Sequence, residues 1–132
     1  MKKTSYTVVL AVALSLVFFT GLTAQKKTVI RESHMQNLVM AVKSDNDGLK
    51  RSGIYWAGYY KVEKMVPLLL EEFTHENSKN KILIALSLYQ MGKDSCIIKL
   101  MELSKYERNF EVKRICDAVV EQYQIDAELA SK

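Results

Sequence analysis

Proline and glycine are scarce in this 132-residue chain, which has one proline, Pro67, and five glycines. Two cysteines are too few for the disulfide framework that stabilises many small secreted domains. The sequence also lacks a glycine-rich phosphate loop, paired Cys or His residues at metal-binding spacing, and any low-complexity tract. These absences exclude a disulfide scaffold and give no support to a nucleotide-dependent or zinc-dependent enzyme.

The N-terminal segment 1–24 has the layout of a secretory signal peptide. Lys2 and Lys3 form a positive start, the apolar run 8–19 is interrupted only by Ser15, and Ala24 supplies a small residue before the cut. This run is much shorter than the roughly 20 residues that a membrane-spanning helix needs. We therefore expect residues 1–24 to be removed on export to the periplasm or beyond, which leaves no membrane span. An uncleaved membrane anchor is the alternative.

The charge balance changes when this segment is set aside. The whole chain has 19 basic and 15 acidic residues, a net charge of +4, and the loss of Lys2 and Lys3 reduces this to +2. A nucleic-acid-binding protein needs a concentrated basic face. We expect no nucleic-acid partner, because neither the net charge nor the exported location favours one.

The rest of the chain is predicted to be all-α, because apolar residues recur at three- and four-residue steps. Ser33 with Gln36 suggests a capping box, Asp94 or Ser95 and Asn109 suggest later caps, and Gly92 suggests a helix end. Pro67 fits if it lies in or just past the first turn of its helix. The expected helices cover residues 33–43, 48–60, 63–74, 79–91, 94–106 and 109–125. They form one domain, 33–125, with an extension at 25–32 and a tail at 126–132.

The apolar pattern of the segment 35–42 recurs at 66–73 and again, at the same interval, at 97–104. Eleven of the twelve positions that this recurrence aligns are apolar, and Ser104 is the exception. The aligned sets are Met35, Leu38, Val39 and Val42; Val66, Leu69, Leu70 and Phe73; and Ile97, Leu100, Met101 and Ser104. A unit of this length is a helix pair that cannot bury its apolar stripe alone, so we expect about three stacked pairs.

The residues of these pairs resemble the HEAT-like repeat family, which has an armadillo-type fold. The resemblance covers about residues 33–124 and lies in Leu49-Lys50-Arg51-Ser52-Gly53, Ala57-Gly58, Val66-Pro67-Leu68-Leu69 and Leu88-Tyr89-Gln90-Met91-Gly92. It implies a short right-handed α-solenoid of about three antiparallel helix pairs with a curved protein-binding surface. Ser104, Asn80 and Glu121 depart from the family pattern, and TPR-like pairs are the alternative fold.

Catalytic, metal-binding and cofactor-binding residues are not expected. The two histidines, His34 and His75, lie far apart in the chain and out of step with the repeat, without a nucleophile and an orienting carboxylate nearby in sequence. Cys96 and Cys116 are interpreted as small core residues, and Cys116 occupies the position of Gly53. A disulfide between them is the alternative.

The candidate partner surface combines exposed tyrosines with outward positions of the second helix of each pair. On the helix 48–60 we expect Trp56 and Tyr60 in the core, while Tyr55 and Tyr59 form an exposed or partly buried stripe. The surface consists of Tyr55, Tyr59, Met40, Leu68, Glu71, Glu72, Lys99, Glu102 and Leu103.

The predicted function is a non-catalytic protein-interaction module or small scaffold in the cell envelope. The alternatives are a structural subunit that self-associates through its terminal repeats, and an accessory subunit of an enzyme. The recurring pairs Lys50-Arg51 and Lys113-Arg114 are interpreted as surface residues that pair with turn acids such as Asp45 and Asp47. A basic ridge for an acidic partner or an anionic lipid is the other interpretation.

Overall fold

The structure of the protein is a computed structural model that describes residues 32–132. Every regular element in this part of the chain is helical, which confirms the all-α prediction. The elements are α2 (Glu32–Val42), α3 (Asp47–Tyr59), a short 3₁₀ helix η1 (Glu63–Met65), α4 (Val66–His75), α5 (Ser78–Met91), α6 (Asp94–Ser104) and α7 (Phe110–Ala130). The expected signal peptide lies outside the described residues. Within them, no helix is long and apolar enough to cross a membrane.

Three of the helices begin in the same way, with an asparagine as the N-cap. The side chains of Asn46, Asn77 and Asn109 each accept a hydrogen bond from the backbone N–H three residues later, at 3.0 Å. Each bond satisfies an amide that the first helical turn leaves without a partner. Positions in α3, α5 and α7 can therefore be compared by counting from the capping asparagine.

The other helix ends follow the sequence in part. Pro67 is the second residue of α4, as expected, and Gly92 ends α5 with a left-handed backbone, φ 66°. The capping box at Ser33 is wrong, since α2 has already begun at Glu32, and α6 follows Lys93 without a side-chain cap. The predicted tail is also largely helical, because α7 continues to Ala130 and no glycine or proline interrupts it.

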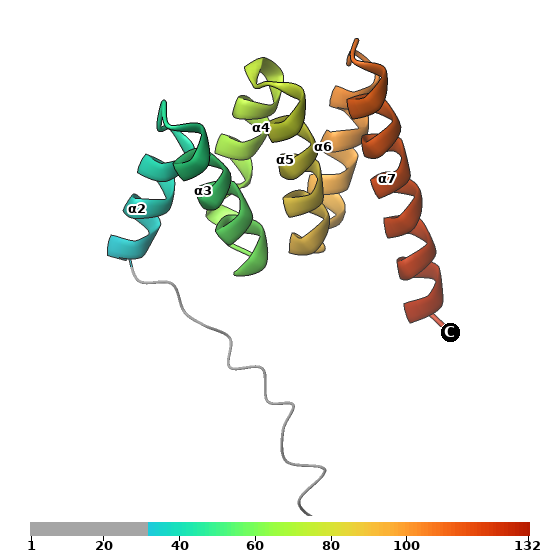
Figure 1. Ribbon diagram of the computed structural model, residues 1–132. Coiled ribbons are helices and arrows are strands. Elements are labelled where there is room, and N and C mark those ends of the chain that lie inside the picture. The colour runs from blue at the N-terminus through green and yellow to red at the C-terminus, as the bar shows by residue number, and fades with distance from the viewer. Residues whose placement is uncertain (1–31) are drawn as a thin grey trace, which may run out of the picture.

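Helix α5 lies at the centre of the helix packing. Helix α3 packs against α2 and α5, and α5 packs in addition against α4, α6 and α7. Figure 1 shows α3, α5 and α7 side by side in front of α4 and α6. The core between them is continuous and contains Val42, Ile54, Leu69, Phe73, Ile84, Leu88, Leu100, Val112 and Val120.

Two glycines allow α3 to approach its neighbours closely. A Cβ atom on Gly53 would lie 2.8 Å from Cβ of Ala41 in α2, and one on Gly58 would lie 2.7 Å from Cα of Ser87 in α5. Such distances are too short for a side chain, so glycine at both positions sets the spacing between the helices.

Candidate interaction surfaces

Four aromatic side chains cover the exposed side of α3. Tyr55, Trp56 and Tyr60 are each 42% exposed and Tyr59 is 57% exposed. Their rings form a chain of contacts: Tyr55 stacks on Tyr59 with centroids 5.9 Å apart, and Trp56 stacks on Tyr60 at 5.4 Å. The buried side of the helix is lined by Gly53, Ile54, Ala57 and Gly58. The large rings lie on the opposite side because the neighbouring helices approach over these smaller residues.

The prediction that Trp56 and Tyr60 lie in the core is therefore wrong. A helical wheel places them on one side with Leu49 and Gly53, and it assumes that a neighbouring helix covers that side. Gly53 is covered by α2, but Leu49 remains 50% exposed. Of the two stripes predicted for α3, the exposed one formed by Tyr55 and Tyr59 is found as expected.

The remaining residues of the predicted surface lie on α2, α4 and α6, apart from the two tyrosines. Met40 is 70% exposed, and Glu71, Lys99 and Glu102 are also exposed, while Leu68 and Leu103 are partly buried. Lys99 pairs with Glu102 on its own helix at 3.6 Å. The structure thus divides the predicted surface into a tyrosine pair on α3 and a scattered set on three other helices.

Glu72 does not belong to the surface at all, which corrects the prediction. It is 7% exposed, and its carboxylate lies 3.3 Å from the ammonium of Lys50 on α3. Lys50 also binds Glu76, directly after α4. The basic pair Lys50-Arg51 was expected to find its acids in the turn before α3, but Lys50 bridges α3 to the following helix instead.

Hydrogen bonds and charge perturb both partners of this bridge. The hydrogen bond to Glu76 raises the pKa of Lys50 above its ordinary value, against the opposing effect of burial. Burial would raise the pKa of Glu76, but hydrogen bonds from Lys50 and Asn80 outweigh it and hold this pKa below 4.5. The bridge is therefore charged on both sides at neutral pH.

Asn80 extends the bridge into a polar cluster in the interior. Its side-chain amide donates to Asp47 and to Glu76, both at 2.9 Å, and the residue is fully buried. Its Oδ1 atom has no hydrogen-bond partner. Asn80 is polar where an aliphatic residue was expected, and its two donors connect the carboxylates of Asp47 and Glu76.

A second bridge repeats the first one in the next helix pair. Lys81 on α5 lies 2.7 Å from Glu107, just before α7, and the two side chains are 16% and 7% exposed. Burial would raise the pKa of Glu107, but the Lys81 ammonium and the backbone N–H of Asn109 lower it overall. In both bridges the lysine follows its capping asparagine by four residues and binds a glutamate 26 residues further on.

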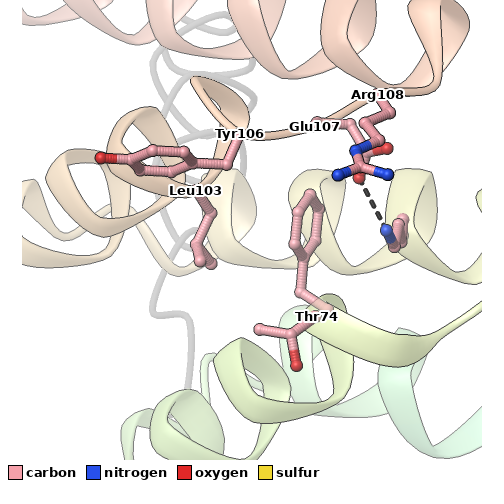
Figure 2. A pocket seen from close by; sticks show the side chains of 7 residues that line it. Thr74, Leu103, Tyr106, Glu107 and Arg108 are labelled. Atoms are coloured by element: carbon pink, nitrogen blue, oxygen red, sulfur yellow. Dashed lines mark hydrogen bonds and ion pairs between the residues drawn. The ribbon is translucent and has the colours of Figure 1, made fainter.

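The Lys81–Glu107 bridge lies in a shallow groove of about 340 Å³ (Figure 2). Thr74, Leu103, Tyr106, Glu107 and Arg108 are among its lining residues, and Tyr106 is 84% exposed. No sequence motif pointed to a pocket here. Glu107 already has an ammonium and a backbone N–H as partners, so the groove contains a satisfied ion pair and no free carboxylate.

The two cysteines are free and buried. Burial raises the pKa of both thiols, that of Cys116 to about 11. These properties agree with the interpretation of both as small core residues rather than a disulfide. Cys116, Gly53 and Ile84 all follow their capping asparagine by seven residues, and all three are buried.

The histidines lie on separate helices, His34 on α2 and His75 at the end of α4, and both are exposed. His75 is 3.6 Å from Glu72. Among residues 32–132, no group of three or more His, Cys, Asp or Glu side chains could hold a metal ion.

Comparison with known proteins adds no assignment to these surfaces. No protein-family model, no curated protein and no solved structure matches the chain.

Proposed function

We propose that this protein is a non-catalytic protein-interaction module of the cell envelope, built as a short right-handed α-solenoid of HEAT-like helix pairs. Packing of the helices in chain order supports the solenoid, since α3 contacts α5 and α5 contacts α7. The layout of residues 1–24 supports export. The exposed tyrosines of α3 support a binding role.

The stacked pair of Tyr55 and Tyr59 is the observation that carries the proposal. Tyrosines combine a large contact area with few rotatable bonds, and they are enriched among residues that dominate interfaces. Because the two rings already lie against each other 5.9 Å apart, part of the ordering that binding requires is present in the free protein.

The tyrosine pair belongs to a face that crosses three helices. Residues nine and thirteen positions after the capping asparagine are exposed in all of them. We call this the row face; it consists of Tyr55, Tyr59, Leu86, Gln90, Ala118 and Gln122. It is aromatic over α3, carries Leu86 over α5 and is uncharged throughout. A partner that buries it needs an apolar surface with polar groups that match the tyrosine hydroxyls and the two glutamines.

A double substitution, Tyr55→Ser with Tyr59→Ser, tests this proposal. Tyr106→Ser is the matched control, because Tyr106 is also an exposed tyrosine but lies outside the row face. The tagged full chain is crosslinked in its own cells and the adducts are identified by mass spectrometry. We expect a discrete protein adduct for the wild type and for the control, and a loss of about tenfold or more for the double variant.

Circular dichroism of the three proteins checks that the double variant remains folded. The proposal is wrong if the folded double variant recovers the same adduct in the same yield as the wild type, because the row face would then not be the binding surface.

A further inference from the structure

The two ends of the α3–α5–α7 row differ in chemistry. Counting from the capping asparagines, the residues at the third, tenth and fourteenth positions are Asn80, Ser87 and Met91 in α5, and all are buried. In α7, Val112 and Val119 are buried and Tyr123 is partly buried. These positions face the preceding helix of the row, as the hydrogen bond from Ser87 to the carbonyl oxygen of Ile54 demonstrates.

The same three positions are open in α3. They hold Leu49, Trp56 and Tyr60, which are 50%, 42% and 42% exposed. We call these three residues the end face. Larger apolar side chains, Leu49 and Trp56, stand here at the positions that Asn80 and Ser87 occupy in α5, so this end of the row has more apolar surface at these two positions.

The other end of the row carries charged residues at the corresponding positions. The positions by which α3 contacts α5, eight and twelve residues after the cap, hold Ile54 and Gly58 in α3 but Asp117 and Glu121 in α7. Both acids are exposed, and they lie beside Lys113 and Arg114 along the outer side of α7, where Phe110 is also exposed. A polar outer surface is what a terminal helix needs to remain in solution. Of the two ends of the described row, the end face is the one that has no charged residue at the compared positions.

We propose that the end face pairs with the end face of a second copy, which gives a two-fold symmetric dimer. The three side chains are uncharged, so the two-fold arrangement brings no like charges together, and stacked Trp56 and Tyr60 supply large apolar area. The polar outer sides of α7 then remain in solvent at the two far ends of the dimer.

Head-to-tail association is sterically disfavoured. Suppose that α3 of one copy docked on α7 of another with the geometry that α5 has on α3. Trp56 would then occupy the place of Ser87, and Glu121 would occupy the place of Gly58. Even a methyl group at Gly58 would come within 2.7 Å of Ser87. Two large side chains cannot share that space, so the chain does not extend itself by repeating its internal contact.

The chain contains a single tryptophan, Trp56, so its fluorescence reports on the end face directly. The full chain is diluted stepwise, and its mass by light scattering is measured together with iodide quenching of Trp56. We expect a dimer at high concentration with Trp56 protected from iodide, and a monomer on dilution with Trp56 quenched.

Two matched variants assign the contact. Leu49→Glu places two carboxylates across the two-fold axis and is expected to raise the dimer dissociation constant at least about tenfold. Ile98→Glu is the control, since Ile98 on α6 is 51% exposed, close to the 50% of Leu49. It should leave the dissociation constant unchanged. Circular dichroism verifies that both variants keep the helical fold.

Three results would overturn the proposal. A monomer at all concentrations with Trp56 quenched means that the end face is open. A monomer with Trp56 protected means that another part of the same chain covers it. A dimer that survives Leu49→Glu means that the copies meet through a different surface. Trp56 of the end face touches Tyr55 and Tyr59 of the row face. The dimer is measured on the purified chain alone and partner binding by the crosslinked adduct, so the two proposals fail separately.

Discussion

Gly58 of α3 lies against the backbone of Ser87 in α5, so close that a Cβ atom on the glycine would come within 2.7 Å of Ser87 Cα. This contact sets the distance between two helices of the α3–α5–α7 row. It also explains why Ser87 is small and buried, and why it can donate its hydroxyl to the carbonyl oxygen of Ile54 at 3.0 Å.

Gly58→Ala should therefore destabilise the protein, although alanine is the better helix former. Overpacking of a close contact costs about 1 to 3 kcal/mol, which exceeds the gain of roughly 0.5 to 1 kcal/mol from replacing glycine in a helix. Urea unfolding followed by circular dichroism measures the difference. Gly48→Ala is the control, because its nearest neighbour is a side-chain atom of Asn46 at 3.3 Å and the residue is exposed. Equal stability of the two variants would contradict the close contact.

The turn between α3 and η1 contains Lys61, whose backbone gives a second prediction. Lys61 has φ 52°, in the left-handed region that glycine tolerates and other residues enter at a cost of about 1 kcal/mol. Lys61→Gly should relieve this strain and raise the free energy of unfolding by a few tenths to about 1 kcal/mol. Gly92→Ala should have the opposite sign, since Gly92 has φ 66° with open space around it. Thermal unfolding of both variants measures the two changes in stability. A change in the same direction for both would contradict the left-handed backbone at Lys61 and Gly92.

Acid should weaken the two lysine–glutamate bridges. The pKa values of Glu76 and Glu107 are held below the ordinary 4.5 in the folded protein. A lowered carboxyl pKa stabilises the fold above the unfolded-state value, and this contribution disappears as pH falls through the folded-state pKa. We expect the free energy of unfolding to be level near pH 7 and to fall below pH 4.5.

Glu107→Gln should lower stability by about 1 to 3 kcal/mol at pH 7, because Lys81 remains mostly buried without its charged partner. Its stability should also depend less on pH below 4.5. Glu102→Gln, in an exposed pair, should leave both unchanged. Urea midpoints at neutral and acidic pH measure these effects, and an unchanged pH dependence in Glu107→Gln would rule the bridge out as a source of acid sensitivity.

The buried cysteines should react slowly. Because burial raises the pKa of Cys116 to about 11, little thiolate is present at neutral pH, and the thiol is also shielded from reagents. Iodoacetamide at pH 8 should modify Cys96 and Cys116 far more slowly in the native protein than in urea. Mass spectrometry over time follows the labelling. Rapid labelling without denaturant would show that the helices around α7 open readily.

The apolar repeat predicted most of the fold because it reflects local periodicity. Helix positions and the buried faces of Leu69, Phe73 and Leu100 follow from it. Its exception, Ser104, and the unexpectedly polar Asn80 both have structural reasons. Asn80 bridges two carboxylates, and buried Ser104 donates to the carbonyl oxygen of Met101 and to Asp117.

The surface was predicted less well, because exposure depends on which helix lies next to a given stripe. Trp56 and Tyr60 have the spacing of core residues, and only the absence of a covering helix among the described residues leaves them open. The bridges were also missed, although their signal was present. Lys50 and Lys81 each precede their glutamate by 26 residues, and the interval between the two lysines is the interval of the apolar repeat.

Native-state hydrogen exchange, read by mass spectrometry for each helix, tests most directly whether the helix pairs pack in chain order. Helix α5 contacts α3, α4, α6 and α7, whereas α2 packs mainly against α3 and has one fully buried residue, Val42. Amides that exchange only after wide opening belong to the most enclosed elements. We expect the slowest exchange in α5 and the fastest in α2, and slower exchange in α2 than in α5 would rule out this packing.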